Sequence, residues 1–296
     1  TRPSSQALHP IEAAYFHQPH LKGRQDYGHQ VVSVMLSCNG ITLNYAVILY
    51  DKSKSKIQIV KEIAEELPIA PVVSYFLCDS WYTSSKVMDS FIRKGFYTIG
   101  ALKTNRILYP WGIRQKASLF ALHLRKTDPG VSLVTVGGRQ FYVYRYEGEL
   151  NGIPNAAVII SYPKDAFGNP KALRLFLSTD VSLSTLEILE TYIKRWPIEL
   201  FFRQSKSKLA LDKYQLRSRQ GIQRYWLIMS LVHFLCCMHS ESYCAFEEGY
   251  AFLQKQLKQE QLTNLYRFIK SGASIEAVME LSLIHISEPT RLDVIS

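Results

Sequence analysis

Five residues near position 200 combine the side chains that phosphate chemistry uses: Tyr192, Arg195, Glu199, Arg203 and Lys206. If one helix runs through them, at about 100° per residue, they share one narrow face. That face carries one carboxylate among cations and a phenol, which suits a metal ion held against a phosphate. A solvated helical surface is the alternative interpretation, because i,i+4 pairs such as Arg195 with Glu199 often only support the helix.

A second carboxylate follows a strand-like apolar run. Asp79 comes directly after residues 71–78, and a carboxylate just past a buried parallel strand lies at the sheet edge where α/β folds bind ligands. The alternative role for Asp79 is an N-cap of the helix predicted over residues 84–94. Trp81 and Tyr82 either line the same site or pack against it.

The order Y-x2-R-x3-E-x6-K around Glu199, with the segment from Asp79 through residues 95–103, resembles a known family. It is similar to the bacterial insertion-sequence transposases of the DDE type, in the YREK branch of the RNase H-like superfamily. The resemblance implies metal-dependent cleavage at transposon ends and strand transfer into target DNA. Asp79 and Glu199 would be the catalytic metal ligands, for two Mg²⁺ or Mn²⁺ ions. The DNA-binding residues would be Tyr192, Arg195, Arg203 and Lys206.

The chemistry explains why two distant carboxylates should converge. Phosphodiester cleavage by water or by a DNA 3′-hydroxyl is an in-line displacement, and two divalent ions stabilise its attacking and leaving oxygens. Carboxylate oxygens are the hard ligands that Mg²⁺ and Mn²⁺ prefer. By resemblance, the protein would act as a homodimer on paired transposon ends in a synaptic complex.

Both ends of the sequence depart from the family pattern. The pattern includes an earlier aspartate on the opening strand of the sheet, and we interpret the nearest candidates, Asp26 and Asp51, as surface residues. The sequence therefore predicts an N-terminally truncated chain that is inactive or nearly so. Residues 282–291 resemble a translated sequencing adapter, although a polar tail is the alternative, and residues 281–296 are left out of the fold prediction.

The predicted fold class is α/β, an RNase H-like mixed sheet that lacks its first strand, with a β-rich insertion and a C-terminal helical region. Strands are expected at 29–38, 41–50, 71–78 and 96–102, with helices at 57–67 and 84–94. Strands of the insertion are expected at 131–136, 140–146, 156–161 and 173–178. Later helices are expected at 183–195, 219–240, 246–257 and 259–280, with a bend at Trp196-Pro197. The expected domain organisation is an N-terminal segment 1–28, core 29–103, insertion 104–180, catalytic helix and core 181–240, C-terminal helices 241–280 and tail 281–296.

The charge of the chain favours a polyanionic partner. The net charge is +10, and nine cations face two acidic residues between positions 194 and 224. A DNA backbone could pass there, although a solvated helical face is the alternative. Five cysteines give neither a disulfide framework nor zinc spacing. The apolar stretch 226–238 is too short to span a bilayer and predicts a buried helix with His233 as a core residue. These features predict a cytoplasmic, nucleoid-associated protein without a membrane partner.

Other interpretations remain open at the level of sequence. One is a non-catalytic DNA-binding remnant, and another is an RNase H-like metal nuclease without strand transfer. An unrelated basic protein, the third, would place Asp79 and Glu199 far apart. The insertion's aromatic residues favour core packing over base stacking, and Trp111 is a weaker candidate for contacting a base.

Overall fold

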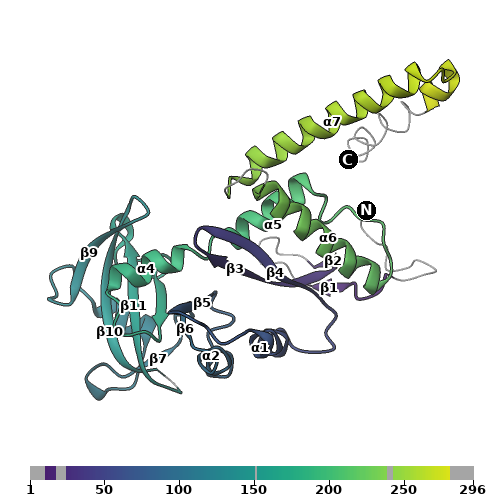
Figure 1. The fold of residues 1–296 in the computed structure, drawn as a ribbon. Helices are drawn as coiled ribbons and strands as arrows, with labels where there is room; N and C mark the ends of the chain where they lie inside the picture. The colour runs from purple at the N-terminus through teal and green to yellow at the C-terminus, as the bar shows by residue number, and fades with distance from the viewer. Residues whose placement is uncertain (1–10, 18–24, 151, 239–242, 281–296) are drawn as a thin grey trace. The chain divides into compact units, whose positions relative to one another are not determined.

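The computed structural model describes residues 11–17, 25–150, 152–238 and 243–280 (Figure 1). The chain divides into two compact units. The first consists of residues up to 36 and residues 44–227, and the second of residues 37–43 and the chain from 228 onward. The proposed adapter segment, 281–296, lies outside the described residues.

An eight-stranded mixed sheet dominates the first unit. Its strand order is β5-β6-β12-β11-β10-β7-β8, and β9 pairs with β10. The strands are β5 (Ser74–Cys78), β6 (Phe96–Leu102), β7 (Ile107–Leu108), β8 (Gln115–Lys116), β9 (Val131–Val136), β10 (Arg139–Leu150), β11 (Ile153–Pro163) and β12 (Arg174–Ser178). In the described part of this sheet only β5 and β6 pair in parallel, and β12 pairs antiparallel with β6. This is a mixed α/β architecture compatible with the RNase H-like fold that we predicted.

The β-rich insertion extends the same sheet instead of forming a separate layer. Residues 156–162 of β11 are all buried, as expected for a central strand covered on both faces. Side chains on one face of the insertion strands pack with α3 (Ala117–His123), which we did not predict. On the opposite face, Val143 and Ile159 pack with Ile188 and Leu189 of α4 (Thr185–Ile193).

Two helices and the parts of a hairpin outside residues 37–43 form a second core of the first unit. The hairpin consists of β3 (Gln30–Cys38) and β4 (Ile41–Tyr50), which turn at Asn39-Gly40 with φ of 50° and 80°, as an Asn-Gly hairpin turn requires. It packs against α1 (Lys56–Glu66) and α2 (Ser85–Ile92), which lie side by side (Figure 1). Phe76 of β5 stacks on Phe91 of α2, with ring centroids 3.7 Å apart. The hairpin and the large sheet therefore share these helices.

Two short elements near the N-terminus were not predicted. β1 (Tyr15–His17) and β2 (Asp26–Gly28) form a two-stranded antiparallel sheet. Asp51 also differs from our interpretation as a surface residue, since its side chain is only 14% exposed. Its carboxylate accepts hydrogen bonds from Ser53 and pairs with Arg219 at 2.7 Å.

The C-terminal helices correct two predictions. Residues predicted as two helices, 246–257 and 259–280, begin with one long helix, α7 (Phe246–Lys270), because no glycine or proline interrupts residues 250–270. The helix α6 (Arg219–Cys237) is not buried all round, since Leu227, Ile228 and Leu231 are each at least half exposed.

His233 is a core residue, as predicted, and its ring stacks on that of Phe246 at 4.5 Å. No helix in the described part of the chain is long and apolar enough to cross a membrane.

Candidate active site

Asp79 lies at the carboxyl end of β5, as predicted, and is exposed. The N-cap of α2 is Ser84, so the alternative role of Asp79 as that N-cap is wrong. The Asp79 carboxylate instead accepts a hydrogen bond from the backbone N–H of Trp81 at 2.8 Å, and its carbonyl accepts one from the N–H of Tyr82. An aspartate bonded to the backbone two residues on forms a tight turn. The carboxylate is thereby fixed at the strand end.

The turn that follows Asp79 is held against β6. A Cβ added at Gly100 would lie 2.5 Å from the Thr83 methyl and 2.8 Å from the Cys78 sulfur, so only glycine allows this approach. Arg106 donates a hydrogen bond to the Thr83 carbonyl at 2.7 Å. Both contacts fix the turn from the β6 side.

The set near position 200 spans two helices and a turn. Tyr192 belongs to α4, Arg195 to the turn, and Glu199, Arg203 and Lys206 to α5 (Pro197–Lys208). Backbone bonds of the i→i+3 type carry the chain from α4 into α5, and Pro197 occupies the first turn of α5. One straight helix with a single face is therefore wrong, and the predicted bend at Trp196-Pro197 is confirmed.

Arg195 connects the two helices. Its guanidinium donates to the Glu199 carboxylate at 2.5 Å and lies 5.6 Å from the ring centroid of Tyr192. The Arg195 side chain is 21% exposed and that of Glu199 is 41% exposed. Tyr192 also packs on Phe176 of β12, with centroids 4.8 Å apart. The side chain of Arg195 thus lies between the phenol and the carboxylate.

Electrostatic effects link this group to Asp79. Burial raises the pKa of Tyr192, the positive charge of Arg195 opposes the rise, and the negative charge of Asp79 adds to it. Burial raises the pKa of the Cys78 thiol, with Asp79 adding to the rise and Arg195 opposing it. Such effects require proximity. Asp79 and Arg195 therefore both lie within electrostatic range of Cys78 and Tyr192, and Arg195 bonds Glu199. We refer to Asp79, Tyr192, Arg195 and Glu199 as the cluster.

Arg203 and Lys206 continue from this cluster along α5. Both are exposed, whereas Phe201 and Ser205 of the same helix are buried. Eight of the nine cations between positions 194 and 224 are exposed: Lys194, Arg203, Lys206, Lys208, Lys213, Arg217, Arg219 and Arg224. The local surplus of positive charge is thus a surface property that begins beside Glu199.

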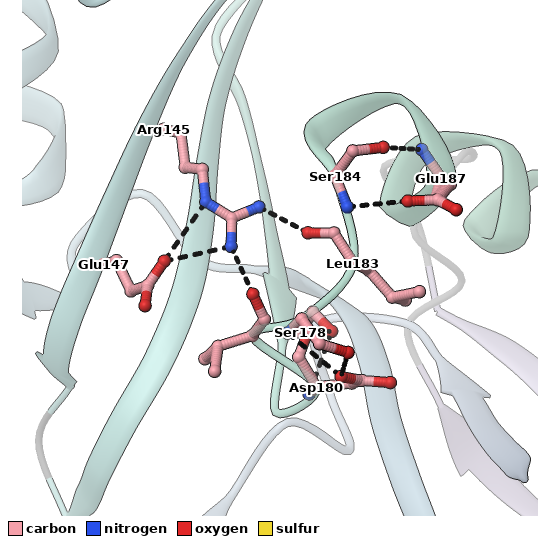
Figure 2. A network of polar contacts seen from close by, with 9 residues as sticks. Arg145, Glu147, Ser178, Asp180, Leu183, Ser184 and Glu187 are labelled. Atoms are coloured by element: carbon pink, nitrogen blue, oxygen red, sulfur yellow. Dashed lines mark hydrogen bonds and ion pairs between the residues drawn. The ribbon is translucent and has the colours of Figure 1, made fainter.

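Strand β10 holds the loop that leads into α4. The Arg145 guanidinium donates to the Leu183 carbonyl at 2.7 Å and to the Val181 carbonyl at 2.8 Å, and Glu147 pairs with it at 3.0 Å. Figure 2 shows Arg145 between Glu147 and Leu183. In the same loop the Asp180 carboxylate accepts from Ser182 at 2.6 Å and from Tyr75 of β5 at 3.1 Å. The loop is therefore fixed from two strands of the sheet.

Helix α4 begins with a capping box. Ser184 accepts from the Glu187 N–H, and the Glu187 carboxylate accepts from the Ser184 N–H (Figure 2). The reciprocal bonds satisfy two donors that the helix start would otherwise leave unpaired. They set where the helix carrying Tyr192 starts.

Lys56 and Arg145, which we did not predict from the sequence, also act near the candidate site. Burial lowers the pKa of Lys56 and the nearby Asp79 charge opposes that shift, while the ammonium lies 5.1 Å from the Tyr50 ring centroid. Lys56 is the first residue of α1 and follows a lysine-rich segment, and Arg145 lies in the alternating strand β10. Both positions predict ordinary surface cations, so no local sequence signal distinguishes them.

The side chains of Asp79 and Glu199 have oxygen donors of the type that Mg²⁺ binds. Among the described residues, no group of three or more His, Cys, Asp or Glu side chains could hold a metal ion. Mg²⁺ usually keeps several waters and is bound through one or two carboxylates together with substrate phosphates. Asp79 and Glu199 supply that number of hard oxygen ligands, next to cations that would bind the phosphates.

The mixed sheet of eight strands and its helices make this an α/β protein whose fold is compatible with the RNase H-like class. The sequence model described as "Transposase DDE domain" matches residues 8–235, so the chain belongs to this transposase family. No curated protein matches the chain.

Proposed function

We propose that Asp79 and Glu199 bind two divalent ions, Mg²⁺ or Mn²⁺, for cleavage of DNA at transposon ends and strand transfer into target DNA. Stabilisation of the attacking and leaving oxygens is the chemistry that such ions supply when bound. The supporting observation is the connected cluster that runs from Asp79 through Tyr192 and Arg195 to Glu199. It joins the carboxyl end of a strand to the start of α5.

The surrounding residues would position the substrate. Arg195 orients Glu199 by its hydrogen bond and presents a partly exposed cation to a phosphate of the scissile strand. The Tyr192 hydroxyl would hydrogen-bond near the same strand. Arg203 and Lys206, both exposed on α5, would contact phosphates farther along the DNA backbone.

The proposal also includes the branch of the family, the oligomeric state and the level of activity. The spacing of Tyr192, Arg195, Glu199 and Lys206 assigns the chain to the YREK branch. A homodimer would hold two transposon ends together in a synaptic complex. With Asp79 and Glu199 as two of the three carboxylates of the pattern, this protein would cleave DNA weakly or not at all.

A non-catalytic DNA-binding remnant is the second candidate. It is favoured by the metal-ligand set, which has fewer than three clustered donors among the described residues. Such a protein would use the basic surface of α5 and α6 without metal chemistry. A metal nuclease without strand transfer is the remaining alternative.

These candidates predict different results in one assay. The printed chain, Asp79→Asn and Glu199→Gln would each be incubated with a labelled DNA duplex and Mn²⁺, and binding, cleavage and joining would be followed. Asp89→Asn, an exposed aspartate of α2, is the matched control. Our proposal predicts that Mn²⁺ strengthens DNA binding and that any cleavage depends on the metal. Both effects should be lost in Asp79→Asn and in Glu199→Gln, and both should remain in Asp89→Asn. Binding that ignores Mn²⁺ in every variant would favour the remnant, and cleavage without joining would favour the nuclease.

A further inference from the structure

An exposed tryptophan lies directly beside the proposed metal ligand. Trp81 is 53% exposed, whereas Trp226 is 3% exposed in the core of the same unit. The Nζ of Lys103, at the end of β6, lies 5.2 Å from the centroid of the Trp81 ring. A large aromatic side chain left in solvent with a cation over it has the composition of a nucleic-acid contact.

The backbone of Trp81 is fixed relative to Asp79. The Trp81 N–H donates to the Asp79 carboxylate at 2.8 Å, and two residues later the Thr83 carbonyl accepts from Arg106 at 2.7 Å. Gly100 allows the turn to lie against β6. Because the turn is fixed from both sides, the indole is presented at a set place next to the carboxylate.

Several cations lie near this turn, beside the Asp79 carboxylate. Lys103 lies over the indole, Arg106 bonds the turn, Lys56 interacts with Asp79, and Arg195 interacts with the neighbouring Cys78. A polyanion is the partner that complements these cations. A DNA base has a flat π-face that stacks on tryptophan, and its phosphate would meet Lys103.

We infer that Trp81 and Lys103 form a stacking platform for an unpaired nucleotide next to the scissile phosphate. Lys103 would contact the phosphate of that nucleotide, and Trp81 would stack on its base. The inference rests on the proposed function, since it places the nucleotide by reference to Asp79. It adds a substrate-contacting pair outside the Tyr-Arg-Glu-Lys set.

The test uses DNA binding without metal, so that cleavage does not enter. Fluorescence anisotropy in EDTA would compare two labelled duplexes of the same arbitrary sequence, one blunt and one with a short unpaired end. Base stacking on an aromatic side chain is strong enough for the full chain to prefer the unpaired end by about tenfold. Trp81→Ala should lose this preference, and Trp81→Phe should keep most of it. Trp111→Ala, which removes a tryptophan that is 82% exposed, should keep it fully.

The outcomes separate the inference from the proposed function. If Trp81→Ala still prefers the unpaired end, or if the wild-type chain shows no preference, the platform is refuted while the metal assay on Asp79 and Glu199 stands. If the wild-type chain binds neither duplex in EDTA, the platform is refuted, and binding of the same duplexes with Mn²⁺ tests the proposed function separately. Lys103→Gln provides a second variant with an intact indole, and it should reduce the salt dependence of binding to the unpaired probe by about one unit of slope.

Discussion

The guanidinium of Arg195 lies 2.5 Å from the carboxylate of Glu199 across the bend between α4 and α5. Glu199 is therefore neutralised by a neighbour on the same segment in the absence of a metal ion. An ion that binds Glu199 must compete with this pair. Because Arg195 and a metal ion would compete for the Glu199 carboxylate, removing Arg195 should change the affinity of the site for the metal.

Removing that cation should strengthen metal binding. In Arg195→Gln the Glu199 carboxylate loses its partner, and a partly exposed ion pair is worth on the order of 1 kcal/mol or less, so we expect a roughly two- to fivefold lower dissociation constant for Mn²⁺. Electron paramagnetic resonance of free Mn²⁺ would measure it. Lys194→Gln, which removes the adjacent exposed cation, is the control. Weaker Mn²⁺ binding in Arg195→Gln would contradict the competition.

The hydrogen bonds that Arg145 of β10 donates to the loop before α4 should order the start of that helix. Arg145→Gln removes donors from the Val181 and Leu183 carbonyls, and each lost charged hydrogen bond costs about 1–3 kcal/mol. We expect faster hydrogen exchange of the amides in residues 185–193. Lys164→Gln, whose ammonium bonds Gln140 on the same sheet, should leave those amides unchanged. Equal amide exchange in both variants would show that the Arg145 hydrogen bonds do not order the start of α4.

The basic surface of α5 should set the salt dependence of DNA binding. Arg203→Gln and Lys206→Gln should each lower the slope of log K against log salt by about 1, because each removes one phosphate contact. Lys54→Gln is the control, since Lys54 is already paired with Glu62 at 2.8 Å. Unchanged slopes in the α5 variants would place the DNA elsewhere.

Individual strands were predicted from the sequence more accurately than the way in which they pair in the sheet. The hairpin β3–β4 was predicted with its turn because the sequence Asn39-Gly40 is typical of a two-residue hairpin turn. The positive φ of both residues confirms it. The insertion strands were predicted from alternation, but the pairing of β12 with β6 was not. Local patterns contain no information on which distant strand is the partner, and the register Leu177↔Gly100 joins segments far apart in the chain.

In the candidate site, too, some features were predicted from the sequence and others were not. Pro197 signalled the bend between α4 and α5, and the strand end predicted the position of Asp79. Arg145 and Lys56 could not be found in this way, because their partners are loop carbonyls and a carboxylate on other elements. A side chain whose role depends on tertiary contacts resembles any surface cation in a sequence.

His233 should make stability depend on pH. Burial lowers its pKa to about 4, below the value of about 6.5 expected for the unfolded chain. The unfolded state therefore binds the proton more tightly, so the stability contributed by the neutral ring is complete above pH 6.5 and is lost as the pH falls toward 4. We expect a loss on the order of 2–3 kcal/mol across this range.

The matched variant for this prediction is His233→Phe, which keeps an aromatic ring against Phe246 and cannot titrate. Urea unfolding at several pH values, followed by circular dichroism, would compare it with the wild-type chain. The difference in unfolding free energy between the two proteins should change between pH 6.5 and 4. A constant difference would show that His233 does not titrate on unfolding.

Mn²⁺ titration calorimetry of single and double variants would measure whether Asp79 and Glu199 bind metal at one site. We predict that Asp79→Asn and Glu199→Gln each weaken Mn²⁺ binding strongly and that the double variant is no weaker than the worse single variant, since ligands of one site act together. Asp89→Asn should bind as the wild type does. Mn²⁺ binding that survives in either single variant at wild-type strength would contradict the account.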